Sequence, residues 1–175
     1  MVLKLIKRCP KYVAGYKEFC QELYDHNIVY FRPTRPESID ADWFKRTKEK
    51  KEKKEQGLIE GQSPSLHFWA VDGEQFIGEF QLRTEFTEKV LTDIGSIGYG
   101  VKVSQWGKGY GTEILRLGFA IAKGLGMEKV LFTINEKNTR SIHVCEKLGG
   151  KLEDTIDAYN EAEGQHRLRR YWIEL

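Results

Sequence analysis

The segment SQWGKGYGTEIL, residues 104–115, places glycine at every second position directly before an apolar helical pattern. The glycines are Gly107, Gly109 and Gly111, and Lys108 adds a positive charge between them. The first N–H groups of a helix lack intrahelical partners and carry partial positive charge, so such a segment favours phosphate binding. Glycine also lets the backbone approach an anion closely. The same pattern fits a tight turn before a purely structural helix.

The spacing of these glycines argues against two common nucleotide motifs. A Walker motif needs Gly, four residues and then Gly-Lys-Ser/Thr, and the chain has no such run. The dinucleotide pattern Gly-x-Gly-x-x-Gly is missed at its last spacing. An ordinary nucleoside-triphosphate or NAD site is therefore not expected.

Composition is that of an ordinary soluble protein. The 175 residues suit one domain, residues 1–175, with 40% apolar and 31% charged residues. A formal net charge of +2 is too weak to argue for nucleic acid. No apolar run approaches the roughly 20 residues that cross a bilayer, and the N-terminus does not read as a signal peptide. We therefore expect neither a nucleic-acid partner nor a membrane.

The cysteines are few and widely separated: Cys9, Cys20 and Cys145. This spacing predicts neither a disulfide framework nor a zinc site, so we expect no metal. A reducing cytoplasm is the simplest location for the chain.

Hydrophobic periodicity predicts a mixed α/β domain, with antiparallel strands early and a strand–helix–strand unit late. Helices are expected at 12–27, 38–57, 112–126 and 138–150. Strands are expected at 2–7, on either side of 72–73, and at 96–103, 129–134, 151–159 and 165–175. Ser38 is the expected N-cap of the second helix. The Lys/Glu run of that helix fits a solvated helix face or a mobile loop better than a nucleic-acid arm.

Two longer stretches, IGYGVKVSQWGKGYGTEIL and VLFTINEKNTRSIHVCEKLGG, strongly resemble the GNAT superfamily of acetyl-CoA-dependent N-acetyltransferases. The family pattern is a strand, an Arg/Gln-x-x-Gly-x-Gly/Ala loop, a helix, a strand, an Asn and a helix ending near Leu-Gly. The match covers about the last half of the chain. It implies an α/β (α+β mixed) fold, with a central, mostly antiparallel mixed sheet of about six to seven strands and about four helices on its two faces.

The resemblance assigns a set of residues to acetyl-CoA. Backbone N–H groups from the loop would hold the diphosphate: Gly107, Lys108, Gly109, Tyr110, Gly111 and Thr112. Val101 and Val103 on the preceding strand would pair with the pantetheine amides as an added strand does. Asn138 and Ser141 would meet the pantetheine arm. Trp106 stands at the family's Arg/Gln position, which is a departure.

Catalytic assignments rest on the same resemblance and on the chemistry of acetyl transfer. Glu79 is the candidate base, directly or through water, and a cross-strand surface pair is its alternative role. Relatives often place Tyr where this chain has Cys145, which is either a proton donor to the leaving thiolate or a buried filler. Tyr99 is the other candidate acid. The Val101 N–H could stabilise the negative charge on the carbonyl oxygen.

Other chemistry-bearing residues carry weaker signals. His67 and His143 could act as bases but show no partner, so structural or surface roles are preferred. Tyr30, Phe31 and Arg32 lie in a region that often covers the acceptor in relatives, although packing alone explains them.

The sequence therefore predicts an N-acetyltransferase. It would move acetyl from acetyl-CoA to a primary amine by direct attack in a ternary complex. The acceptor, a small molecule or a protein N-terminus, carries no motif. A non-catalytic acyl-CoA-binding module or sensor is the alternative, and a nucleic-acid-binding protein is a weaker one. The last strand could pair across a homodimer.

Overall fold

Strands and helices occupy the segments that the hydrophobic pattern predicts. The computed structural model describes residues 2–31, 33–161 and 163–175. Within these residues the strands are β1 (Leu3–Lys7), β2 (Ser65–Asp72), β3 (Gln75–Arg83), β4 (Ile97–Val101), β5 (Lys129–Asn135), β6 (Lys151–Asn160) and β7 (Gly164–Glu174). The main helices are α1 (Val13–Asp25), α2 (Trp43–Glu55), α3 (Tyr110–Gly124) and α4 (Thr139–Lys147). Short helical turns include η2 (Pro36–Ser38), η3 (Val90–Ile94) and η4 (Val103–Gln105).

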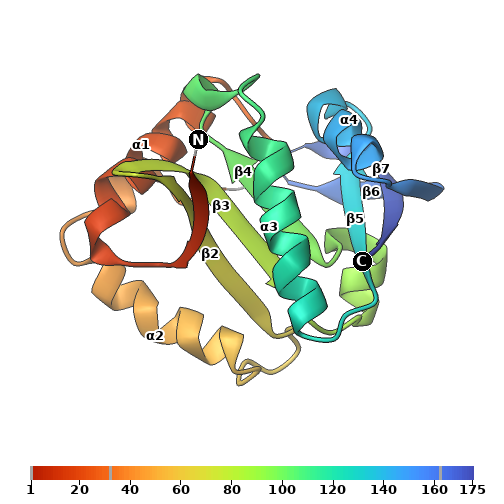
Figure 1. The fold of residues 1–175 in the computed structure, drawn as a ribbon, viewed down its shortest axis with the longest axis horizontal. Coiled ribbons are helices and arrows are strands. Elements are labelled where there is room, and N and C mark those ends of the chain that lie inside the picture. The colour runs from red at the N-terminus through yellow and green to blue at the C-terminus, as the bar shows by residue number, and fades with distance from the viewer. Residues whose placement is uncertain (1, 32, 162) are drawn as a thin grey trace.

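The strands form two sheets where the sequence predicts one. Their orders are β1-β2-β3-β4 and β5-β7-β6, and every pairing within the described residues is antiparallel. The sheets meet where the Ser96 N–H donates to the Leu131 carbonyl at 2.8 Å and the Leu131 N–H donates to Ser96 Oγ at 2.7 Å. Gly95 permits this approach, because a Cβ there would lie 2.8 Å from the Leu131 carbonyl oxygen. Beyond this junction β4 and β5 do not pair (Figure 1).

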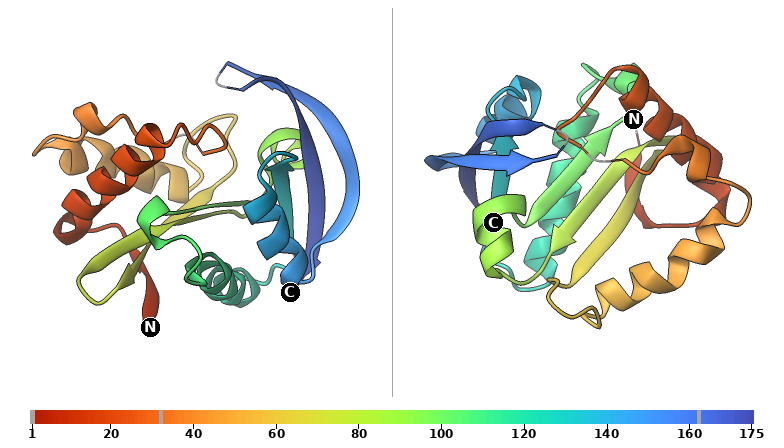
Figure 2. Two further views of the ribbon diagram at one scale, coloured as in Figure 1. Left: turned by 90° about the horizontal axis from the view of Figure 1, so that it is seen from above. Right: turned by 180° about the vertical axis from the view of Figure 1, so that it is seen from behind.

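Helices cover both faces of the four-stranded sheet. Figure 2 shows α1 and α2 on one face and α3 on the other. On the α3 face, Phe80 lies so close to Gly118 that a Cβ on Gly118 would be 2.2 Å from its ring. Side chains alternate between the faces of a sheet, so Tyr99, directly opposite Phe80, shares this face. Glu79 therefore points to the α1 and α2 face.

Helix α2 begins later than the sequence predicts. It starts at Trp43, whereas Ser38 lies in η2 and its hydroxyl donates to the Arg35 carbonyl at 2.7 Å. The expected N-cap is wrong, because the preceding turn already uses that hydroxyl. The Lys/Glu run is a helix face, with an exposed Glu49–Lys53 ion pair at 2.7 Å. Exposed pairs of this kind add little stability.

The core is divided into two clusters by the four-stranded sheet. Under α3 the cluster includes Ile114 and Leu115, and under α1 it includes Phe19 and Trp69; all four side chains are buried. Within the described part of the chain, none of the helices combines the length and apolar character needed to pass through a bilayer.

Candidate active site

The loop before α3 takes the conformation that its glycines permit. Gly107 and Gly109 have φ of 76° and 84°, in the left-handed region that other residues avoid. No described atom lies within 4 Å of a Cβ built on either residue. Glycine is therefore required here by backbone conformation and not by crowding. Gly109 is the N-cap of α3.

Within the part of the chain that the structure describes, the first N–H groups of α3 bond to no protein acceptor. Among the described residues no side chain caps this helix. Its backbone bonding begins where the Glu113 N–H donates to the Gly109 carbonyl at 3.2 Å. The preceding amides of Tyr110, Gly111 and Thr112 have no intrahelical acceptor and carry partial positive charge. All three residues line a cavity, so the helix start can receive an anion.

Side chains from distant elements fix this loop. The Glu22 carboxylate on α1 accepts from the Ser104 N–H at 2.9 Å and from the Ser104 hydroxyl at 2.8 Å. The Tyr110 hydroxyl donates to the Asp72 carboxylate at 2.9 Å. Hydrogen bonds from the Val2 N–H and from Tyr110 hold the pKa of Asp72 below its ordinary value. The loop and the start of α3 are thus held in place from both sides.

The outer edge of β4 presents backbone groups away from β3. The Lys102 N–H donates to the Ile77 carbonyl at 2.8 Å. Bonded and non-bonded pairs alternate along an antiparallel ladder, so the N–H and C=O groups of Tyr99 and Val101 point outward. Trp106 Nε1 donates to the Val101 carbonyl at 3.0 Å. Among the described residues, the Val101 N–H and the N–H and C=O of Tyr99 have no bonding partner, so an extended ligand could add to this edge.

A cavity of about 390 Å³ connects the loop with this edge. One end is formed by the loop and the start of α3, and the middle by Tyr99, Gly100 and Val101. The other end lies against α1 and the segment after it: Leu23, Ile28, Tyr30 and Phe31. The cavity therefore passes round the free edge of β4, from the α3 face to the α1 face.

Helix α4 forms the opposite wall of the cavity. Asn138 caps it, because its Oδ1 accepts from the Ser141 N–H at 3.3 Å. The Tyr99 hydroxyl donates to Ser141 Oγ at 3.2 Å, and all three residues line the cavity. Burial raises the pKa of Tyr99, so this phenol keeps its proton at neutral pH. The cofactor residues expected on α4 and the candidate acid on β4 are thus brought together.

Arg140 lines the cavity although no sequence motif marks it. Its guanidinium lies 4.3 Å from the centre of the Trp106 ring, so a side chain of α4 reaches the loop before α3. Such cation–π contacts need a tertiary approach that periodicity does not reveal. Lys108, expected near the phosphate, donates to Gln105 Oε1 at 3.0 Å and does not line the cavity.

Val103 and Cys145 lie outside the cavity wall, as Lys108 does. The sequence predicts Val103 on the strand, and this is wrong: β4 ends at Val101, and Val103 begins η4. Its side chain packs into the cluster beneath α1. Cys145 is buried in the cluster beneath α3, and burial raises its pKa to about 12. A Cβ on Gly150 would lie 2.5 Å from the Cys145 Sγ, so the packing around Cys145 leaves no room for a side chain there.

Glu79 lies beside the cavity but does not line it. It pairs across the sheet with Gly100, and a Cβ on that glycine would lie 3.0 Å from Phe19 and 3.2 Å from Phe31. The rings of Phe19 and Phe31 thus lie against Gly100 on the sheet face that Glu79 shares. Burial raises the pKa of Glu79, while the positive charge of Lys51 opposes the rise.

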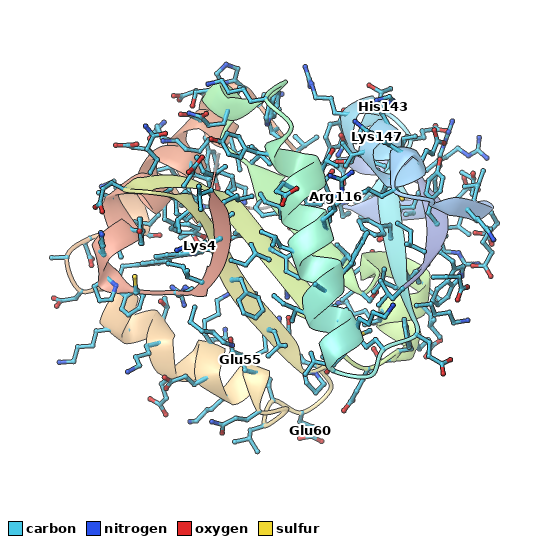
Figure 3. The ribbon with its side chains drawn as sticks, in the orientation of Figure 1. Lys4, Glu55, Glu60, Arg116, His143 and Lys147 are labelled. Carbon is cyan, nitrogen blue, oxygen red and sulfur yellow. The ribbon has the colours of Figure 1, made fainter. Side chains whose placement is uncertain are left out.

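The two histidines have different surroundings. His67 is buried on the α2 side, where burial and nearby Lys51 lower its pKa to about 2. It contacts Lys51 Nζ at 3.4 Å and Ser65 Oγ at 3.3 Å, away from the cavity. His143 is exposed, lines the cavity mouth and lies one turn before Lys147 on α4 (Figure 3). Arg32 falls outside the described residues.

The candidate site thus joins an open helix start and a free strand edge through one cavity. Residues 13–151 match the family described as the acetyltransferase (GNAT) domain. This chain belongs to that family, and the membership implies acetyltransferase activity.

Solved structures share the whole fold. The microcin self-immunity acetyltransferase MccE, in complex with acetyl-CoA and AMP, matches with a TM-score of 0.76 at 15% identity, covering 99% of this chain and 92% of that one. The ribosomal L7/L12 alpha-N-protein acetyltransferase RimL, in complex with coenzyme A, matches with a TM-score of 0.73 at 13% identity, covering 99% of this chain and 94% of that one. A chimera of the spermidine N-acetyltransferase SpeG from Vibrio cholerae and hSSAT matches with a TM-score of 0.68 at 14% identity, covering 99% of this chain and 96% of that one. At these identities the likeness shows the fold and does not select an acceptor.

Proposed function

We propose that this protein transfers the acetyl group of acetyl-CoA to a primary amine by direct attack in a ternary complex. The observation that carries the proposal is the continuity of the cavity. It begins at the unpartnered amides of Tyr110, Gly111 and Thr112 and follows the free edge of β4 as far as Tyr99. An anionic head and an extended amide-bearing arm are the parts of coenzyme A that fit these two surfaces.

Different residues of this chain would bind different parts of acetyl-CoA. Backbone N–H groups from Gly107 to Thr112 would hold the diphosphate. The Val101 N–H and the backbone of Tyr99 would pair with the pantetheine amides, with Asn138 and Ser141 on the other side. Val103 is left out of this set, because its side chain packs beneath α1. The Val101 carbonyl contributes less than expected, since Trp106 already bonds it.

Bound acetyl-CoA supplies the acetyl thioester, and the protein positions the amine against it. The Tyr99 hydroxyl holds a proton on the cavity wall and would give it to the leaving thiolate. The Val101 N–H would stabilise the negative charge that develops on the carbonyl oxygen. Cys145 is not proposed as the acid, because it is buried in the core and does not line the cavity.

Glu79 is proposed as the base, acting through water. Its carboxylate shares a sheet face with Gly100, the glycine at the middle of the cavity. Opposite residues in a bonded antiparallel pair have Cα atoms about 5.5 Å apart. Movement of Phe31 would open the short path between them. A raised pKa suits a base that must return its proton near neutral pH.

Thermal unfolding and thiol release together test the proposal. Acetyl-CoA at about 100 times its Kd should stabilise the fold by about 2.7 kcal/mol. Free thiol should then appear only when an acceptor amine is added. Stabilisation without thiol release from any amine would favour the non-catalytic acyl-CoA-binding module. Absence of both effects would overturn the acyl-CoA site itself.

A further inference from the structure

We propose that the acceptor is a monoamine attached to an apolar or aromatic group, with no second positive charge. This inference rests on the proposed function and names its substrate class. It concerns the end of the cavity that lies away from the α3 amides. That end is lined by Leu23, Ile28, Tyr30 and Phe31.

The first observation is a second cavity next to this end. It measures about 280 Å³ and shares Leu23, Ile28 and Phe31 with the first. Its remaining lining residues are Tyr24, Asn27, Val29 and Pro33. A cavity of about 150 Å³ lined by aliphatic and aromatic side chains is enough to hold benzene. An apolar group on the acceptor therefore has room beyond the wall that the two cavities share.

Phe31 is one of the three residues that line both spaces, together with Leu23 and Ile28. Its ring lies 5.8 Å from that of Phe19, centre to centre. It also covers the face of Gly100, where a Cβ would approach it to 3.2 Å. An amine directed at the middle of the cavity, with its apolar group in the second space, must pack against this ring. Phe31 is thus the expected specificity residue.

The second observation is the absence of carboxylates. Among the described residues, neither cavity is lined by Asp or Glu, and the first cavity is lined by Arg140 and His143 on α4. The nearby Glu22 carboxylate is already bonded to Ser104. The Glu79 carboxylate lines neither cavity. A polyamine would place its second ammonium against these apolar side chains without a counter-charge, which is unfavourable.

The same surroundings select the protonation state of the acceptor. An ammonium entering an apolar wall without a carboxylate loses hydration that nothing replaces. The neutral amine enters more easily. An α-amino group, with a pKa of about 8, is neutral far more often at pH 7.5 than an alkylamine with a pKa above 10. The site therefore favours the less basic amine of a matched pair.

Three acceptors test this class by initial-rate thiol release with acetyl-CoA. They are phenylalaninamide, glycinamide and spermidine. Phenylalaninamide should exceed glycinamide in kcat/KM by about tenfold to hundredfold, as expected for burial of one large apolar side chain. Spermidine should give no release above the rate without acceptor. Faster reaction of spermidine than of phenylalaninamide would overturn the inference while leaving the acetyltransferase activity established.

Phe31→Ala supplies the matched variant. The ratio of phenylalaninamide to glycinamide should fall towards one, and the shift in Tm on adding acetyl-CoA should stay as in the unchanged protein. Phe86→Ala is the control, since Phe86 is a partly exposed aromatic residue outside both cavities. An unchanged ratio in Phe31→Ala would overturn the assignment of the apolar subsite. Loss of the acetyl-CoA shift in the unchanged protein would instead indicate failure of the proposed function.

Discussion

The two ends of the cavity are lined by different kinds of chemical group. At the α3 end the cavity presents backbone amides, positioned by two left-handed glycines and held by Glu22 and Asp72. At the α1 end it is lined by the apolar and aromatic residues Leu23, Ile28, Tyr30 and Phe31. The α3 end can bind the same chemical group in many proteins, because every chain has amides. The α1 end can change with each substitution, which suits it to an acceptor that differs between relatives.

A substitution that alters the backbone should therefore damage the α3 end most. Gly109→Val would place a β-branched residue at φ of 84°, where it is strained by about 1–3 kcal/mol. The chain would relieve this strain by turning the loop and misaligning the α3 amides. We expect the affinity for acetyl-CoA to fall about hundredfold, measured by calorimetry.

Gly124→Ala is the matched control for that change. Gly124 lies in α3 near its other end, and no described atom lies within 4 Å of a Cβ built there. Alanine is the better helix former, so the variant should be slightly more stable and should bind acetyl-CoA normally. Equal affinity of Gly109→Val and the unchanged protein would show that the amides do not hold the ligand.

The α3 end was predictable from sequence because its conformation is determined by residues close together in the chain. A strand, three spaced glycines and an amphipathic helix lie within one short segment, and each has a strong conformational preference. Seven strands and four helices were recovered in the same way. The division into two sheets was not, because it depends on Gly95, Ser96 and Leu131 meeting across distant segments.

The α1 end was not predictable, since its residues are defined by tertiary neighbours. Phe31 becomes part of a cavity only because Gly100 and Phe19 come against it. Arg140 likewise joins the site only through Trp106. Neither Glu79 nor Cys145 could be placed by spacing, because strand alternation and helix packing decide which side each one faces.

Substitution of Tyr99 tests whether a side chain at the middle of the cavity contributes as much to activity as the α3 amides do. Tyr99→Phe keeps the ring but removes the hydroxyl that donates to Ser141 Oγ at 3.2 Å. We expect kcat to fall about hundredfold, the lower range for loss of a general acid, with little change in acetyl-CoA affinity. Ser141→Ala should have a smaller effect on kcat, because the phenol keeps its proton without that partner. A normal kcat in Tyr99→Phe would remove the phenol from the reaction.

Substitution of Glu79 tests whether a carboxylate on the α1 and α2 face of the sheet takes part in the reaction. Glu79→Gln should lower kcat about tenfold, since a base that acts through water is partly replaced by water itself. In the unchanged protein, kcat should decline as pH falls through the raised pKa of Glu79, because the carboxylate then takes up a proton. The variant should lack this decline.

Stability provides an independent check on that assignment. Burial raises the pKa of Glu79 above its ordinary value of 4.5, so the fold favours the protonated form. The resulting stabilisation is present below the unfolded pKa and is lost as pH rises through the folded pKa. Glu79→Gln should therefore raise Tm at neutral pH, and the gain should shrink towards pH 4.5. A lower Tm at neutral pH would mean that pairing with Lys51 and Arg8 outweighs burial.

The smallest effect is expected at the exposed contact between α4 and the loop before α3. Arg140→Ala removes the guanidinium that lies 4.3 Å from the Trp106 ring centre. An exposed cation–π contact contributes about 0.5–1 kcal/mol, so the KM for acetyl-CoA should rise two- to fivefold with kcat unchanged. Arg140→Lys should recover part of the loss, because an ammonium also binds the ring face, though less well than a planar guanidinium. Tryptophan fluorescence follows the contact directly, and a Trp106→Phe background identifies the signal. A change in kcat instead of KM would place Arg140 at the reacting atoms, and the division between backbone and side-chain ends would then have to be redrawn.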